Sequence, residues 1–162
     1  MKTLQSIMLK IKYPFLRIQN IWHRIWISIK CERFSNIGYL LSHTKLDLMP
    51  HGWRKAFGEQ MCEEIKQALL KNGRKSLYSY VISDIKEKYG SLRWYDYSAP
   101  KEVHDIIDKY ECQSMCYCIN CGKPVRYITK GWIEYLCEDC AKKTIKPEYL
   151  DECRVTEEDI PH

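Results

Sequence analysis

Four cysteines with a paired spacing are the residues of this chain whose types could bind a metal. Cys118 and Cys121 enclose two residues, fifteen residues follow, and Cys137 and Cys140 enclose two more. Thiolates two residues apart can bind one ion through a tight turn, and two such turns supply the tetrahedral set typical of structural zinc. Because a closed set leaves no open position for water, the spacing predicts a structural Zn²⁺ rather than zinc catalysis.

Two alternatives remain open around this pattern. Cys116 would replace Cys118 if the first turn shifted along the chain, although Gly122 directly after Cys121 favours the later turn because glycine tolerates a left-handed conformation. An iron–sulfur cluster also takes four cysteines, but the paired two-residue spacing favours zinc. No partner spacing gives a role to the remaining cysteines, Cys31, Cys62, Cys112 and Cys153.

No catalytic motif accompanies the cysteines. None of the five histidines lies in a metal or nucleophile motif. The sequence has no glycine-rich phosphate loop, no Gly-x-Ser-x-Gly turn and no paired carboxylates in a recognisable frame. The sequence therefore predicts a protein that is not an enzyme.

Residues 85–95 form a second candidate for binding. Basic and aromatic side chains alternate there, and further basic residues follow in the cysteine-rich segment: Lys86, Lys88, Arg93, Trp94, Lys123, Arg126 and Lys130. Such a surface suits phosphates and stacked bases, or a protein partner. A hairpin with one aromatic face packed on helices and a charged face in water also fits. This second interpretation is favoured because Glu87 and Asp96 reduce the positive field.

Hydrophobic periodicity predicts the elements that position these residues. Apolar residues at helical spacing indicate four helices, over residues 2–12, 15–30, 52–70 and 101–114. Two segments rich in Tyr, Val, Ile and Trp meet at Tyr89-Gly90 and predict antiparallel strands, over residues 76–85 and 91–98. Between the cysteine pairs, residues 125–136 can form a short hairpin, and a helix is expected after Cys140.

The expected fold class is α+β, with helices around a two-stranded antiparallel hairpin and a C-terminal zinc ribbon or treble clef. Composition divides the chain into four parts. These are a basic amphipathic N-terminal arm (1–34), an α+β body (46–115), a zinc ribbon (116–146) and an acidic tail (147–162).

The basic arm has three interpretations that the sequence leaves open. Residues 1–50 hold eight Lys and Arg against Glu32 and Asp47, although the whole chain carries only +5. A basic amphipathic helix with Trp22 and Trp26 suits an anionic membrane surface, or it tracks nucleic-acid phosphates, or its apolar face packs on the same chain. Basic residues interrupt every apolar run, so a spanning helix is not expected. An odd number of cysteines without a secretory signal predicts a cytoplasmic location.

The order of motifs resembles a family of small zinc-ribbon proteins of bacteriophages, prophages and gut bacteria. The motifs are LDLMPHGWR at 46–54, IKEKYGSLRWY at 85–95, CINCGKP at 118–124 and GWIEYLCEDC at 131–140. The resemblance covers roughly residues 46–143 and implies zinc at the four paired cysteines. No activity is assigned to that family, so the resemblance implies no catalytic residues.

These observations favour a non-enzymatic zinc-binding protein of mobile-element origin. We expect it to act in the host cytoplasm by binding a host or viral protein, as an inhibitor of host defence machinery. The alternative is a nucleic-acid-binding protein that uses the basic arm and the ribbon.

Overall fold

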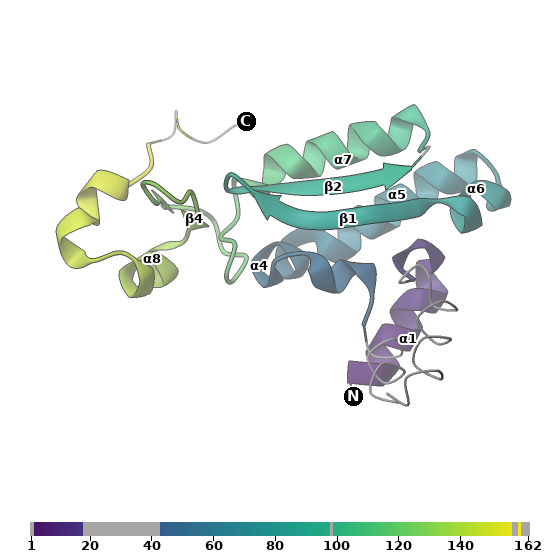
Figure 1. Cartoon of the computed structure of the whole chain (residues 1–162), viewed down its shortest axis with the longest axis horizontal. Coiled ribbons are helices and arrows are strands. Elements are labelled where there is room, and N and C mark those ends of the chain that lie inside the picture. The colour runs from purple at the N-terminus through teal and green to yellow at the C-terminus, as the bar shows by residue number, and fades with distance from the viewer. Residues whose placement is uncertain (1, 18–42, 98, 157–158, 160–162) are drawn as a thin grey trace, which may run out of the picture.

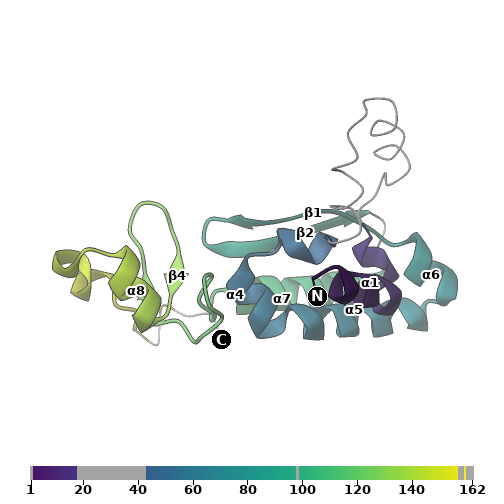
Figure 2. The ribbon, with the colours of Figure 1, turned by 90° about the horizontal axis from the view of Figure 1, so that it is seen from below.

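A two-stranded antiparallel hairpin and the helices packed on one of its faces form the larger part of the protein (Figures 1 and 2). The computed structural model describes residues 2–17, 43–97, 99–156 and 159. Its longer elements are α1 (Lys2–Lys12), α5 (Glu59–Lys71), α6 (Arg74–Ser79), β1 (Val81–Lys88), β2 (Ser91–Tyr97), α7 (Lys101–Ser114) and α8 (Glu138–Thr144). Its shorter ones are η1 (Pro14–Leu16), η2 (Lys45–Leu48), α4 (His51–Trp53), η3 (Arg54–Gly58), β3 (Tyr127–Ile128), β4 (Tyr135–Leu136), η4 (Pro147–Tyr149) and η5 (Asp151–Cys153).

The predicted helix over 52–70 is confirmed as one helical run, α4–η3–α5, which contains a π-helical turn at η3. The apolar residues that step by four along it are all buried: Trp53, Phe57, Met61, Ile65 and Leu69. Asn72 and Gly73 end the run, as expected, and Gly73 has a φ of 94°. The buried face of this run is the centre of the larger core, against which α7 and the hairpin pack.

The predicted hairpin is confirmed, but its first strand begins later than expected. Residues 74–79 form α6, which buries Leu77 and leaves Tyr78 exposed, and β1 starts only at Val81. The strands pair from Val81↔Tyr97 to Lys88↔Ser91, with a register shift between Ile82 and Asp84. The segment before β1 is apolar enough for a strand, but the positive φ at Gly73 starts a new helical turn instead.

The outer edge of β2 is covered by side chains of α7. The Leu92 N–H donates to Ser114 Oγ at 2.9 Å, and the Trp94 N–H donates to the Glu111 carboxylate at 2.9 Å. Glu111 also accepts from Arg93 at 3.0 Å. Because an unpaired strand edge must find partners for its backbone groups, α7 closes one side of this small sheet.

The N-terminal helix predicted over 2–12 is confirmed as α1. After it, η1 buries Phe15 and Leu16 in the core beside Tyr13. The helix predicted over 15–30 is therefore wrong at its start, because η1 is a 3-10 turn and Arg17 after it is extended. The rest of that predicted helix, and with it most of the basic arm, lies outside the described residues. None of the described helices is long and apolar enough to cross a membrane.

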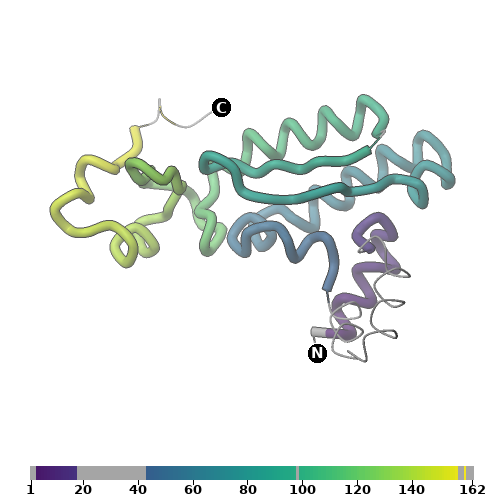
Figure 3. The backbone as a smooth tube through the Cα atoms, viewed as in Figure 1, coloured from purple at the N-terminus to yellow at the C-terminus, as the bar shows by residue number. Residues whose placement is uncertain are grey.

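The chain continues from α7 into a second, smaller unit at one end of the body, which we call the cysteine module (residues 116–155; Figure 3). Its core contains Cys118, Tyr127, Leu136, Cys137, Ala141 and Cys153. Part of the segment described above as an acidic tail belongs to this unit, because the Val155 N–H donates to Arg126 O at 3.0 Å and Lys130 pairs with Glu152 at 2.8 Å.

Candidate metal centre

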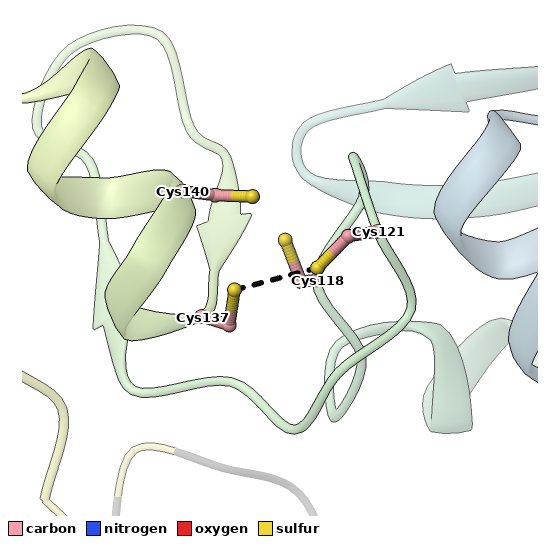
Figure 4. Close-up of side chains that lie close together, drawn as sticks. All are labelled: Cys118, Cys121, Cys137 and Cys140. Carbon is pink, nitrogen blue, oxygen red and sulfur yellow. Dashed lines mark hydrogen bonds between the residues drawn. The ribbon is translucent and has the colours of Figure 1, made fainter.

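The four predicted cysteine ligands meet at one point of the cysteine module. The sulfur atoms of Cys118, Cys121, Cys137 and Cys140 all lie within 4.8 Å of one another, and those of Cys121 and Cys137 are 3.4 Å apart (Figure 4). Cys118 and Cys137 are buried, whereas Cys121 and Cys140 are partly exposed. Four thiols at these separations form a donor set that can hold a metal ion.

The first pair lies in a tight turn that the sequence builds with glycine. The Gly122 N–H donates to Cys118 O at 2.9 Å, and the Cys118 N–H donates to Lys123 O at 2.7 Å. Gly122 has a φ of 77°, the left-handed conformation expected for it. Cys116 is outside the metal-binding group, so the alternative first turn is wrong.

The second pair follows the short hairpin β3–β4, which was predicted within 125–136. Cys137 is the N-cap of α8 and Cys140 lies in its first turn, so both thiols are at the helix N-terminus. Free N–H groups and the helix dipole there favour a negatively charged thiolate. The helix expected after Cys140 is α8, which begins two residues before Cys140. Both sulfurs of the second pair point toward the first turn (Figure 4).

The first turn rests on the N-terminus of the long helical run of the body. The Gly52 N–H donates to Ile119 O at 2.8 Å, and Trp53 Nε1–H donates to Tyr117 O at 3.0 Å. The two backbones are so close that a Cβ on Gly52 would lie 2.1 Å from Cys118 O. Gly52 has no role that its own motif predicts, and its position one residue before Trp53 is the only local signal.

The loop at the β1–β2 turn provides a second contact between the body and the module. A Cβ on Gly90 would lie 2.7 Å from Ile133 Cγ2 and 2.7 Å from Tyr135 Cε2. Two glycines of the body thus allow the module to approach within van der Waals contact. The metal-binding turn is therefore held from outside as well as by its own hairpin.

Burial and neighbouring groups shift the pKa values of Cys118, Cys121 and Cys140. Burial raises the pKa of Cys118, but backbone N–H groups around its sulfur, including that of Cys137, bring the pKa below its ordinary value. Burial and then the neighbouring thiols raise the pKa of Cys140, and burial raises that of Cys121. Because thiolates this close would repel one another, a divalent cation between them would supply the opposite charge.

The basic residues predicted to bind phosphates are mostly paired with acidic residues. Ion pairs join Lys86 to Asp84, Arg93 to Glu111, Lys123 to Asp139 and Lys130 to Glu152. Of the predicted basic residues, only Lys88 and Arg126 have no acidic partner within the part of the chain that the structure describes, and Lys88 lies 5.4 Å over the Tyr89 ring. The structure therefore does not bring these residues together as an unbalanced positive surface.

Trp94 does not belong to the predicted binding surface. It is buried at 4% exposure, and its Nε1–H donates to Tyr80 Oη at 3.0 Å, which in turn donates to Asp96 at 3.0 Å. Its strand position explains this, because Leu92 and Trp94 alternate with Arg93 and face the helices. Stacking of a base on Trp94 would require the hairpin to leave the core.

Comparison of the chain with models of known families, with curated proteins and with solved structures finds no match.

Proposed function

We propose that the four cysteines bind one structural zinc ion. The observation that carries this proposal is the convergence of four thiols from two Cys-x-x-Cys turns, with no other donor among them. The order of a cysteine turn, a short hairpin and a helix that carries the second pair at its N-terminus is that of a treble clef, one of the two zinc modules expected from the sequence. Metal analysis of the purified chain is expected to give one zinc per chain, and a chain that folds with no metal would contradict the proposal.

The zinc centre supports a role in binding rather than catalysis. All four positions around a tetrahedral ion are filled by thiolates, so no position is left for a water or a substrate. The first turn contacts the body through Gly52, so the ion also fixes how the two units of the protein sit together. A rigid pair of units presents the side chains of both as one surface.

The surface where the two hairpins meet is the proposed contact with a protein partner. Tyr89 at the β1–β2 turn is 76% exposed, and Trp132 at the β3–β4 turn is 75% exposed. The two turns meet at Gly90 and Ile133. Large aromatic side chains are the usual hot spots of protein interfaces. The resemblance of residues 46–143 to phage and prophage proteins supports a cytoplasmic host or viral protein, such as a component of host defence, as the partner.

The partner proposal is tested by affinity capture from the host. We expect the full chain to retain a protein that a Tyr89→Ala/Trp132→Ala variant loses and that a Tyr78→Ala variant, altered at a 69% exposed tyrosine on α6, keeps. Both variants should retain zinc and the melting temperature of the parent, because all three side chains are exposed. Equal capture by all three chains would contradict the proposed surface.

The nucleic-acid alternative has less support, because four of the predicted basic contacts are neutralised by ion pairs. Binding to duplex or single-stranded nucleic acid that falls steeply with salt would favour this alternative.

A further inference from the structure

Helix α1 has two opposite faces, and one of them carries apolar side chains that point away from the described part of the body. Ser6 and Tyr13 are buried against the body, and Leu9 packs on the core. Four apolar residues on the other side are exposed and form what we call the outer stripe: Leu4 at 68%, Ile7 at 37%, Met8 at 60% and Ile11 at 69%. Their spacing of i, i+3, i+4 and i+7 makes one continuous strip along the helix.

The outer stripe cannot be the face that packs on the body. At about 100° per residue, its centre lies roughly 180° around the helix from the centre of Ser6, Leu9 and Tyr13. The end of α1 is fixed by Tyr13, whose hydroxyl donates to Glu63 at 3.0 Å, and by Lys12, which pairs with Glu59 at 2.7 Å. Within the part of the chain that the structure describes, the interpretation in which the apolar face of the arm packs on its own chain therefore does not hold for the outer stripe.

The charge beside the outer stripe indicates which kind of surface would suit it. Residues 2–17 contain Lys2, Lys10, Lys12 and Arg17 and no acidic residue. Of these, Lys10 and Lys12 lie roughly 100° to either side of the centre of the outer stripe. Lys12 also pairs with Glu59, and Arg17 is exposed at the end of η1. An exposed apolar strip with basic residues at its sides is the pattern of a helix that lies in the headgroup region of an anionic bilayer.

Other occupants fit this pattern less well. A second copy of the chain would bring two identical basic segments together, and their like charges would oppose the contact. Nucleic acid would use the basic residues but would leave the four apolar side chains without an apolar partner. We propose that α1 binds flat on an anionic lipid surface through the outer stripe. This proposal does not depend on the protein partner or on zinc.

One helix of this length gives weak, reversible binding, because membrane affinity scales with the apolar area buried and with attraction to anionic lipids. We expect the full chain to co-sediment with vesicles of phosphatidylcholine and phosphatidylglycerol, and to remain in solution with phosphatidylcholine alone. Binding should weaken as salt is added, because screening reduces the electrostatic part.

The decisive comparison uses two variants with the same change in charge. Leu4→Asp/Ile11→Asp removes two side chains of the outer stripe, whereas Thr3→Asp/Gln5→Asp places the same charges at exposed polar positions of α1. We expect the first variant to bind vesicles weaker than the second by roughly tenfold or more, because only the first loses apolar area. Both should keep the melting temperature of the parent, since all four positions are exposed.

Any of three results would overturn the proposal. The first is a parent chain with no preference for the anionic vesicles, and the second is equal binding of the two variants to them. The third is a dimer in light scattering that Leu4→Asp/Ile11→Asp converts to a monomer, which would assign the outer stripe to a second copy of the chain.

Discussion

Replacing Cys137 with serine is expected to abolish zinc binding and to unfold the cysteine module. Cys137 is buried and is both a predicted ligand and the N-cap of α8, so its loss removes a thiolate next to Cys118 and Cys121. Binding free energy at structural zinc sites is folding free energy, on the order of 10 kcal/mol. The small apolar core around Tyr127 and Leu136 cannot replace a contribution of that size.

The comparison that isolates the metal is Cys112→Ser. Cys112 is exposed near the end of α7 and lies outside the metal-binding group. We expect this variant to retain one zinc per chain and the melting curve of the parent, whereas Cys137→Ser loses both. Metal analysis and thermal unfolding followed by circular dichroism measure the two effects. A Cys137→Ser chain with unchanged zinc and unchanged melting would show that the cysteines have another role.

Removal of zinc should also lower the stability of the body, although the body has its own core. The first cysteine turn accepts hydrogen bonds from Gly52 and Trp53, which begin the long helical run. When the turn loses its shape, these donors lose their partners, and a buried donor without a partner costs about 1–3 kcal/mol. The larger core from Trp53 to Tyr110 should nevertheless remain folded, because most of its contacts do not involve the module.

The features that sequence could predict are those that repeat along the chain. Apolar residues every fourth position from Trp53 to Leu69 specify one face of a helix, and the structure buries that face. The Cys-x-x-Cys pairs specify ligands because two residues are enough to close a turn on one ion, and the four sulfurs do converge. In both cases the information lies within a few residues of the position that it predicts.

The features that sequence could not predict depend on residues far apart in the chain. Lys130 is paired with Glu152, and Arg93 with Glu111, so the positive charge that the local sequence suggests is neutralised by side chains from other elements. The burial of Trp94 depends on which face of the hairpin α7 covers. The outward direction of the outer stripe of α1 could not be predicted either, because periodicity identifies an apolar face but not what that face contacts.

Gly52 is the clearest example of a residue whose role depends on distant parts of the chain, because that role is set entirely by a contact with residues 118 and 119. In Gly52→Ala the new Cβ would lie 2.1 Å from Cys118 O and 2.5 Å from Ile119 O. Both atoms are backbone and cannot rotate away, so either α4 or the cysteine turn must move. We expect a loss of about 3 kcal/mol or more in the free energy of unfolding, at or above the upper end of the usual cost of overpacking. Zinc should also be released more readily to a chelator.

Gly58→Ala in the same helical run separates this steric effect from the general effect of replacing a glycine. A Cβ at Gly58 would meet Arg54 Cγ at 3.4 Å and Leu46 Cδ1 at 3.5 Å, which are ordinary contacts with side chains. Because alanine favours a helix over glycine by about 1 kcal/mol, this variant should be as stable as the parent or slightly more stable. Urea unfolding and chelator-dependent zinc release of the two variants give the test. If Gly52→Ala behaves like Gly58→Ala, the cysteine turn does not rest on the helix as closely as described. If only Gly52→Ala loses stability and zinc together, the contact between the helix and the cysteine turn couples the body to the metal centre.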